Sequence, residues 1–265
     1  MTLPRVVASD LDGTLLRSDG SVDARTRAAI DLVQAAGSLF VVCTARPPRW
    51  LGPLADEIGH RGLAICANGG VIWDLRTESP VESFPLERTR ALQVVGLLSA
   101  SLPGGAWAVE RTGGFGREPR YQPRWPAPAD TEVAPIEQLL AVPAVKLMLR
   151  HGDFSADELL SCAHALAGGL AELSHSNAAD PLLEISALGV SKASTLARFC
   201  ASHGVAFDQV LAFGDMPNDV LMLRWAGHGV AVANGHADVL AAADEVTTAN
   251  DDAGVARVLE RVFGN

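Results

Sequence analysis

Residues 6–16 read VVASDLDGTLL, and this stretch decides the fold. Two valines and an alanine are typical of a buried strand, yet two aspartates, Asp10 and Asp12, follow it directly. An Asp-Gly pair is a common turn dipeptide, and this accounts for Asp12 and Gly13. It does not account for Asp10, so a carboxylate at the end of an apolar strand needs another explanation.

Apolar runs that resemble strands alternate with helical patterns over both ends of the chain. Strands are expected at residues 3–9, 38–43, 63–67, 209–215 and 228–235. Helices are expected at residues 21–37, 48–59, 191–204, 217–227 and 251–263. Continuous apolar strands between helices indicate a parallel sheet covered on both faces. The sequence therefore predicts an α/β protein with a doubly wound, Rossmann-like parallel sheet.

The middle of the chain, residues 84–188, breaks this alternation. It contains a Gly/Pro-rich stretch at 112–130, a helix and strand at 136–151, a helix at 155–169 and a strand at 181–188. We expect an α+β module inserted into a core domain formed by residues 1–83 and 189–265. The insert contains Trp107, Phe115, Tyr121 and Trp125 among several arginines. These aromatics could stack on a substrate ring or simply pack within loops.

Composition restricts the possible partners. The formal net charge is -10 and the pI is about 5.1, which argues against a broad surface for nucleic acid or anionic membrane. A local cationic pocket for a small anion is still compatible with this charge.

The cysteines and the N-terminus indicate the compartment. The four cysteines show no C-x-x-C spacing, so buried free thiols are favoured over disulfides or a zinc site. The N-terminus lacks a signal-peptide core, and no run of about 18 apolar residues occurs. We expect a cytoplasmic protein.

Polar residues follow three of the expected strands at their carboxyl ends. Asp10, Thr44 and Asp215 each come directly after an apolar run. In parallel α/β sheets, ligands bind at the carboxyl edge, so these three residues predict one convergent site.

The acidic residues of this site predict a metal ion. Asp10, Asp12, Asp215 and Asp219 are candidate ligands. Two carboxylates 4 Å apart repel by ~4 kcal/mol at an effective dielectric of 20, so such a cluster needs a cation or strong pKa shifts. Oxygen donors without His or Cys favour Mg²⁺. Alternatively, Asp219 only caps the helix that follows it.

The same edge is suited to phosphate. Thr44 offers a hydroxyl, Arg46 can form two hydrogen bonds to phosphate oxygens, and Lys192 can place a point charge against a phosphoryl group. Alternatively, Lys192 is a solvated lysine in the first turn of a helix, a position that the helix dipole disfavours.

These residues together resemble the phosphatases of the haloacid dehalogenase superfamily, and most closely its Cof-like branch. DLDGTLL matches the first motif, CTAR the second, the lysine of GVSKAS the third and GDMPNDVLML the fourth. Their order spans nearly the whole chain and includes ANGG at 67–70. Ala45 replaces a usual glycine. VANGHAD also differs from the usual segment, which leaves Asn234 and Gly235 as open site members.

The resemblance implies a role for each site residue. Asp10 would be the nucleophile that forms an aspartyl-phosphate, and Asp12 would be the general acid and then the base. Thr44 and Lys192 would hold the phosphoryl oxygens, and Asn218 would orient Lys192 or the substrate. The magnesium ligands would be Asp10, the Asp12 main-chain carbonyl and Asp215, with Asp219 in support. The insert would be a cap that closes over the site and selects the substrate.

The expected activity is the magnesium-dependent hydrolysis of small phosphorylated metabolites, among them sugar phosphates. A phosphomutase on the same scaffold is the alternative enzyme. A phospho-accepting signalling receiver also uses Asp, Thr and Lys, but Asp12 is placed to hydrolyse the phosphate that a receiver keeps. Dehalogenation is disfavoured because it needs neither the second aspartate nor the metal cluster.

Overall fold

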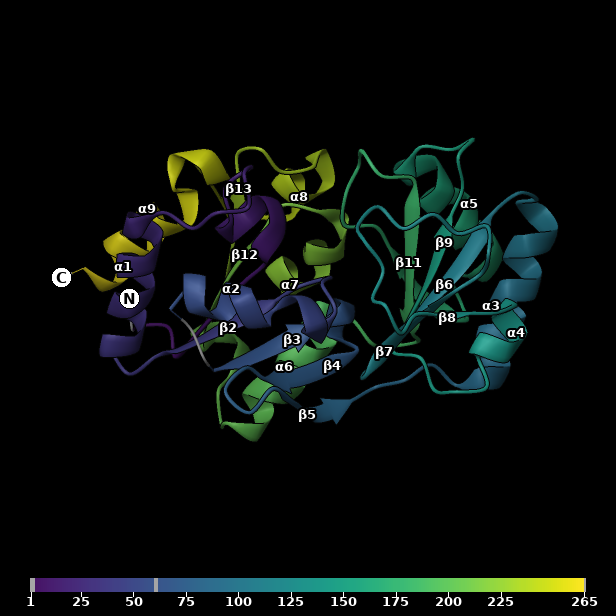
Figure 1. The fold of residues 1–265 in the computed structure, drawn as a ribbon. Coiled ribbons are helices and arrows are strands. Elements are labelled where there is room, and N and C mark those ends of the chain that lie inside the picture. The colour runs from purple at the N-terminus through teal and green to yellow at the C-terminus, as the bar shows by residue number, and fades with distance from the viewer. Residues whose placement is uncertain (1–2, 60–61, 265) are drawn as a thin grey trace. The chain divides into compact units, whose positions relative to one another are not determined.

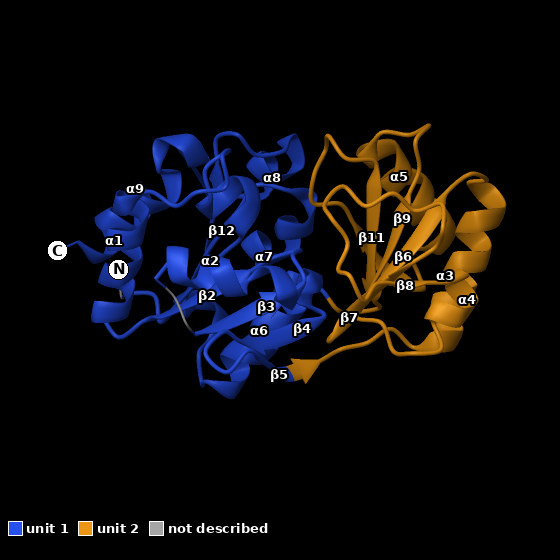
Figure 2. Cartoon of the chain, viewed as in Figure 1, with its two compact units in different colours: residues 1–81, 191–265 blue, residues 82–190 orange. Residues whose placement is uncertain are grey.

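The computed structural model describes residues 3–59 and 62–264, and the chain forms two compact units (Figures 1 and 2). Unit 1 comprises residues 1–81 and 191–265, and unit 2 comprises residues 82–190. The sequence alone places these boundaries after residues 83 and 188. The strand β5, Ser79–Ser83, carries the chain from unit 1 into unit 2.

Unit 1 is built on an eight-stranded sheet with the order β14-β13-β12-β1-β2-β3-β4-β5. The neighbours from β14 to β3 are parallel, and β4 is antiparallel to β3. The strands other than β5 are β1 Val6–Ser9, β2 Leu39–Cys43, β3 Leu63–Cys66, β4 Val71–Asp74, β12 Val210–Gly214, β13 His228–Val232 and β14 Glu245–Thr247. The central strands β1 and β12 are buried along their whole length, as parallel strands between two helical layers should be.

Helices cover both faces of this sheet. On one face, α6, α7 and α8 share an apolar cluster with β1, β2, β3 and β12. On the other, α1 and α9 pack side by side (Figure 1). The bounds are α1 Ala24–Ala35, α2 Gly52–Glu57, α6 Lys192–Ser202, α7 Val220–Trp225, α8 Ala237–Ala242 and α9 Gly254–Phe263. The prediction of a doubly wound, Rossmann-like sheet is confirmed.

The helix starts follow local capping chemistry. The Asp23 carboxylate accepts from the Thr26 main-chain N–H at the start of α1. At α6, Ser191 and Ser194 form a reciprocal capping box, so Lys192 is the first helical residue. The capping box fixes where Lys192 enters the helix.

Unit 2 is a six-stranded sheet with helices on one face. Its strand order is β10-β11-β9-β6-β7-β8, and α3, α4 and α5 pack against it over one apolar cluster (Figure 2). The bounds are α3 Arg88–Ser101, β6 Ala106–Arg111, β7 Gly114–Arg117, β8 Glu132–Val133, α4 Ile136–Leu139, β9 Lys146–Arg150, α5 Ala156–Ala167, β10 Ala171–Ser174 and β11 Leu182–Ala187. The insert is therefore an α+β module, as expected.

The opposite face of the unit 2 sheet is also largely buried. Phe115, Tyr121 and Met148 form a small apolar cluster there. Beside it, Lys146 of β9 forms an ion pair with Glu184 of β11, with 2.5 Å between Nζ and Oε1. Both side chains are almost fully buried.

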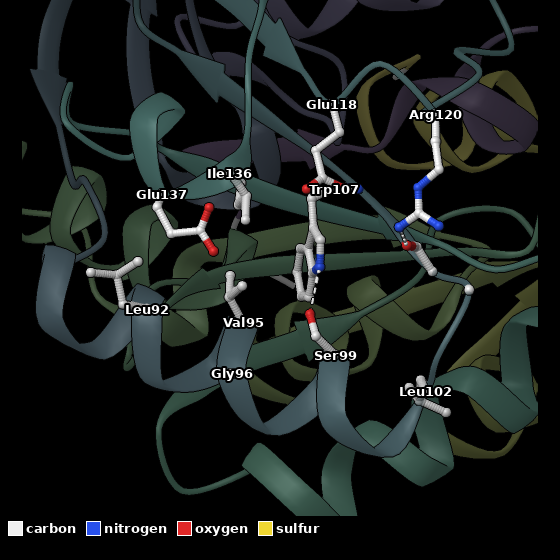
Figure 3. Close-up of a pocket in the computed structure, with 12 residues that line it drawn as sticks. Leu92, Val95, Gly96, Ser99, Leu102, Trp107, Glu118, Arg120, Ile136 and Glu137 are labelled. Atoms are coloured by element: carbon white, nitrogen blue, oxygen red, sulfur yellow. Dashed lines mark hydrogen bonds between the residues drawn. The ribbon is translucent and has the colours of Figure 1, made fainter.

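Unit 2 contains a pocket of about 320 Å³ between α3 and the start of β6 (Figure 3). Trp107 lines it and donates from its indole N–H to Ser99, with 3.0 Å between the atoms. Trp107, Phe115 and Tyr121 are all at least nine-tenths buried, whereas Trp125 is 59% exposed. Three of the four aromatics considered for ring stacking are thus packing residues of unit 2.

The cysteines agree with the expectation from composition. All four cysteines are free, with Cys43, Cys66 and Cys200 buried and Cys162 half-buried. Burial raises the pKa of the Cys66 thiol well above its usual range and that of Cys200 to about 11, so these thiols stay protonated. Within the part of the chain that the structure describes, no helix combines the length and the hydropathy needed to cross a membrane.

Candidate active site

The polar residues that follow β1, β2 and β12 lie next to each other at the carboxyl edge of the sheet. The strand order β12-β1-β2 places Asp215, Asp10 and Thr44 in that sequence along the edge. The Asp10 main-chain N–H donates to Phe213 O at 3.0 Å, which keeps Asp10 in the pairing of β1 with β12. The convergence expected from the sequence therefore occurs.

Three buried carboxylates and one buried ammonium form the centre of this edge. Carboxylate oxygens of Asp10, Asp215 and Asp219 lie within 4.8 Å of one another. Lys192 Nζ donates to Asp10 Oδ1 at 2.6 Å and to Asp219 Oδ1 at 2.7 Å. Lys192 is only 1% exposed, so it is not a solvated lysine of the first helical turn.

Burial and charge shift the pKa values of these groups. Burial raises the pKa of Asp10 well above its usual range, and Asp219 and Asp215 add to the rise although Lys192 opposes it. Burial and then the charge of Asp219 raise the pKa of Asp215 to about 7. For Lys192, burial lowers the pKa, but the charges of Asp10 and Asp219 outweigh it and leave the pKa raised. One ammonium thus faces three carboxylates, and negative charge is in excess.

Asp219 uses both carboxylate oxygens within the protein. Oδ1 accepts from Lys192, and Oδ2 accepts from the main-chain N–H groups of Asp215 and Met216, both at 3.1 Å. Asp219 lies at the N-terminus of α7 but makes no side-chain cap there. These contacts link Lys192 to the loop that follows β12. The bond from the Met216 N–H also caps the turn Pro217–Asp219 that leads into α7, so capping is one of the contacts of Asp219 but not the only one.

Asp215 is held by the turn that follows β1, a single π-type turn at Leu11–Leu15. Thr14 Oγ1 donates to Asp215 Oδ1 at 2.7 Å. Gly13 has φ +82°, and a Cβ there would lie 2.4 Å from Asp215 Oδ2, so only glycine fits. Thr14 was not among the expected site residues, although it lies in DLDGTLL, the same segment as Asp10 and Asp12, and this position could have indicated a contact with the site.

The Asp12 side chain lies outside the buried group. Its carboxylate is half-exposed and accepts from Arg46 twice, at 2.8 Å from Nε and 2.6 Å from Nη2. This hydrogen bonding raises the pKa of Arg46. Arg46, expected to bind phosphate oxygens, thus forms its two hydrogen bonds with Asp12. The expected metal contribution of Asp12 through its main-chain carbonyl does not depend on this side chain.

Thr44 and Asn218 are joined through Asn68, a residue that was not among the expected site members. Thr44 is fully buried; its Oγ1 accepts from the Arg46 main-chain N–H at 3.0 Å. Thr44 O accepts from the Asn68 main-chain N–H at 3.1 Å. Asn218 Nδ2 donates to Asn68 Oδ1 at 2.9 Å. Asn68 lies in the ANGG segment, directly after an expected strand, and this position could have identified it as a residue near the site.

The open site members, Asn234 and Gly235, lie in the loop that supports the edge. Asn234 Nδ2 donates to Gly13 O at 2.8 Å, and Asn234 Oδ1 accepts from the Asn250 main-chain N–H at 2.9 Å. A Cβ at Gly235 would lie 3.3 Å from Asp215 O, so this residue packs closely behind Asp215. Asn234 thus contacts the turn that follows β1, and Gly235 contacts the loop that carries Asp215.

The donor set fits a hard divalent cation. The grouped side chains of Asp10, Asp215 and Asp219 offer only oxygen, and all three are buried. Their excess negative charge would be offset by such an ion, which would favour the ionised forms of Asp10 and Asp215.

Comparisons with known proteins agree on one family. A family model described as haloacid dehalogenase-like hydrolase matches residues 7–259. The 5-amino-6-(5-phospho-D-ribitylamino)uracil phosphatase YcsE of Bacillus subtilis (strain 168) is 27% identical over 256 residues, which cover 96% of this chain and 94% of that protein. The pyridoxal phosphate phosphatase YbhA of Escherichia coli (strain K12) is 29% identical over 269 residues, covering 96% and 97%.

Solved structures share the fold. SMU.1108c from Streptococcus mutans UA159 superposes with a TM-score of 0.84 and 21% identity, covering 99% of this chain and 100% of that chain. Both the sheet of unit 1 and the insert therefore have counterparts in a protein of known structure.

Proposed function

Because this chain belongs to the haloacid dehalogenase-like hydrolases, and thus to the phosphoric monoester hydrolases of that type, we propose that it is a magnesium-dependent phosphatase with an aspartyl-phosphate intermediate. Its substrates would be small phosphorylated metabolites, including sugar phosphates. One observation carries the proposal: Lys192 Nζ lies between the carboxylates of Asp10 and Asp219, and Asp215 belongs to the same buried group.

Magnesium would be held by Asp10, Asp215 and the main-chain carbonyl of Asp12, with Asp219 in support. When bound, the ion would neutralise the excess carboxylate charge and draw a phosphoryl group towards the edge of the sheet. Asp219 suits a supporting role because both of its oxygens already accept hydrogen bonds from the protein.

In the first step, an Asp10 oxygen would attack phosphorus and the bond to the ester oxygen would break. Asp12 would donate a proton to the departing oxygen, so the products are an alcohol and an aspartyl-phosphate. In the second step, Asp12 would take a proton from a water molecule that attacks the same phosphorus. Asp10 is then released as a carboxylate together with inorganic phosphate.

Two further residues would hold the phosphoryl oxygens. Lys192 donates to two carboxylates, which leaves its third N–H for a phosphoryl oxygen. Thr44 would donate its hydroxyl from the neighbouring strand end. Arg46 donates two hydrogen bonds to the Asp12 side chain, so Asp12 would have to leave Arg46 before it could donate a proton in the first step.

The exposure of Asp12 favours hydrolysis over the phosphomutase alternative. Its side chain is 53% exposed, so water reaches the group that would activate it. Unit 2 is proposed to act as the cap that selects among substrates.

The test is a rapid-quench experiment with an aryl phosphate and added magnesium. Wild-type protein should turn over steadily and lose activity with a chelator. Asp12→Asn should release a burst of aryl product approaching one per enzyme and then stall, because an aryl leaving group barely needs an acid but the second step needs a base. Full activity in metal-free buffer would contradict the magnesium assignment, and a dead Asp12→Asn protein without a burst would contradict the two-step role.

A further inference from the structure

The pocket of unit 2 has a wall that packing alone does not explain. Positions along α3 and at its C-cap line this wall: Leu92, Val95, Gly96, Ser99 and Leu102. Gly96 lies in the interior of the helix, where glycine is less stable than alanine. A Cβ at Gly96 would meet no atom of the described residues within 4 Å. The missing side chain therefore enlarges the pocket and does not make room for a neighbouring element.

The other two glycines of the pocket differ from Gly96 because each has a structural reason. Gly104 has φ +103°, a left-handed conformation that favours glycine. A Cβ at Gly105 would lie 2.6 Å from Leu149 Cδ1, so Gly105 is required by close packing. The space beside Gly96 is thus the part of the pocket that the fold itself does not require.

The inner surface of the pocket is apolar and is held in place by a hydrogen bond. The Trp107 indole N–H donates to Ser99 Oγ at 3.0 Å, which ties the start of β6 to α3 (Figure 3). The apolar side chains that line the pocket with this indole are Leu92, Val95, Leu102 and Ile136. Small-molecule sites are typically apolar cavities of this kind with a few polar groups at fixed positions.

The polar groups of the pocket carry an excess of negative charge. Glu118 Oε2 accepts from the Trp107 main-chain N–H at 3.0 Å, which leaves Oε1 for a ligand. Glu137 is exposed, and among the described residues neither carboxylate forms an ion pair. Arg120 donates to Gly105 O at 3.4 Å, on the side of the indole away from Glu137 in Figure 3. Two carboxylates and one guanidinium leave one negative charge, which a monocation would balance.

We propose that this pocket binds a small protonated amine with an aromatic or branched aliphatic body. The ammonium lies between Glu118 and Glu137, away from Arg120, and the apolar body lies against Trp107 and the open space at Gly96. The volume of about 320 Å³ suits a small ligand. All residues that line the pocket belong to unit 2, so the inference does not depend on the proposed phosphatase function.

Calorimetric titration of the full chain with phenethylammonium chloride tests the proposal, at about pH 7, where a primary amine is protonated. Phenethyl alcohol and hydrocinnamate are the neutral and anionic analogues of similar size. The amine should bind with a Kd below about 1 mM. Both analogues should bind at least about tenfold more weakly, because they cannot form charge-assisted hydrogen bonds with the two carboxylates.

Glu118→Gln and Glu137→Gln test the charge. Each variant keeps a side-chain oxygen that can accept a hydrogen bond but loses the negative charge, so each should weaken amine binding about tenfold. Glu82→Gln is the matched control, because Glu82 is exposed on β5 and does not line the pocket. Its affinity should stay within about twofold of wild type.

Gly96→Leu tests the space. Leucine favours the helix and fills the pocket, so this variant should lose amine binding without a lower Tm. Gln93→Leu, at an exposed position of α3 outside the pocket, is its control and should bind like wild type. Asp10→Asn should also bind the amine like wild type, because Asp10 belongs to unit 1.

Four results would overturn the inference. They are no binding by wild-type protein up to about 10 mM amine, wild-type affinity in folded Glu137→Gln or Gly96→Leu, equal binding of hydrocinnamate, and loss of binding in Asp10→Asn. The last result would place the amine at the carboxylates of unit 1. A protein that binds the amine as expected but does not hydrolyse aryl phosphates would overturn the phosphatase proposal alone.

Discussion

The two units each bury a lysine, and the two sites differ in charge and position. In unit 2, Lys146 of β9 pairs with Glu184 of the adjacent strand β11, and Glu110 of β6 lies opposite it in register. In unit 1, Lys192 contacts two aspartates, and a third, Asp215, belongs to the same group.

The position of each lysine explains the difference. Lys146 and Glu184 lie within neighbouring strands, on the face of the sheet opposite α3, α4 and α5. The groups around Lys192 come from the ends of β1 and β12, the turn Pro217–Asp219 and the start of α6. A ligand approaches the edge of a sheet more readily than its middle. We therefore interpret the Lys146–Glu184 pair as part of the packing of unit 2. The excess negative charge around Lys192, at the edge of the unit 1 sheet, instead indicates a site for a cation and an anion.

The largest expected effect is the loss of the proposed nucleophile. Asp10→Asn should lower kcat for an aryl phosphate by at least ~10³, about 4 kcal/mol, because the amide cannot attack phosphorus. Steady-state kinetics on folded protein measures it. Asp31→Asn, at an exposed position of α1, is the control and should match wild type. Substantial turnover by Asp10→Asn would return Asp10 to a structural role.

Lys192→Ala should lower kcat by ~10²–10³, the effect typical of one fixed charge-stabilising donor. The variant loses the ammonium that donates to Asp10 and Asp219 and that we propose donates to a phosphoryl oxygen. Kinetics at saturating substrate, with circular dichroism to confirm folding, measures the change. Near wild-type turnover would remove the functional distinction between the two buried lysines.

Lys146→Met should act on stability rather than on chemistry. It leaves Glu184 buried without its ammonium partner, which should cost about 3 kcal/mol in the free energy of unfolding. Turnover of an aryl phosphate by the folded protein should stay within a few-fold of wild type. Denaturant unfolding measures the first effect and kinetics the second. Adding Glu184→Gln should recover part of the lost stability. A loss in kcat as large as that of Lys192→Ala would contradict the comparison.

The smallest expected effect is the pH dependence of stabilisation by magnesium. The pKa of Asp215 is about 7 in the folded, metal-free protein, whereas an aspartate of the unfolded chain has a pKa of about 4. Between these two pH values, the folded protein keeps a proton on Asp215 that the unfolded chain has lost. This group therefore lowers stability as the pH rises from about 4 to 7. Magnesium needs the ionised form, so its apparent affinity should rise about tenfold from pH 6 to pH 8, about 1.4 kcal/mol.

Thermal unfolding with and without magnesium chloride at each pH measures this difference. Asp215→Asn is the control and should largely abolish both the stabilisation and its pH dependence. An equal magnesium effect at pH 6 and pH 8 would contradict the role of Asp215.

Much of unit 1 could be predicted because its strands are apolar runs of the expected length. The sequence was less informative in unit 2, where α3, β6, β7, β8 and β10 were not identified. The missed strands are short or contain glycine: β10 has only four residues, AELS, and β7 reads GFGR. Their pattern therefore resembles that of loops and surface helices.

The sequence by itself determined which chemical groups stand at the ends of the strands. A buried parallel strand is mostly apolar and carries no charge, so the first charged residue after it, such as Asp10 or Asp215, lies at the carboxyl edge. That argument uses only local pattern and composition. It identified Asp10, Thr44 and Asp215 as candidates, whereas the roles of Asp12, Asp219 and Lys192 also depended on the resemblance to the haloacid dehalogenase superfamily.

Only the tertiary structure decided which of these groups meet. Lys192 reaches Asp10 across 182 residues of sequence, and Arg46 pairs with Asp12 because β1 and β2 are neighbours. Asn68 has φ 56°, and this left-handed conformation depends on contacts of its turn with α6 and the loop after β2. Such contacts follow from strand order and packing, because residue type fixes what a side chain can bind but not which partner lies within reach.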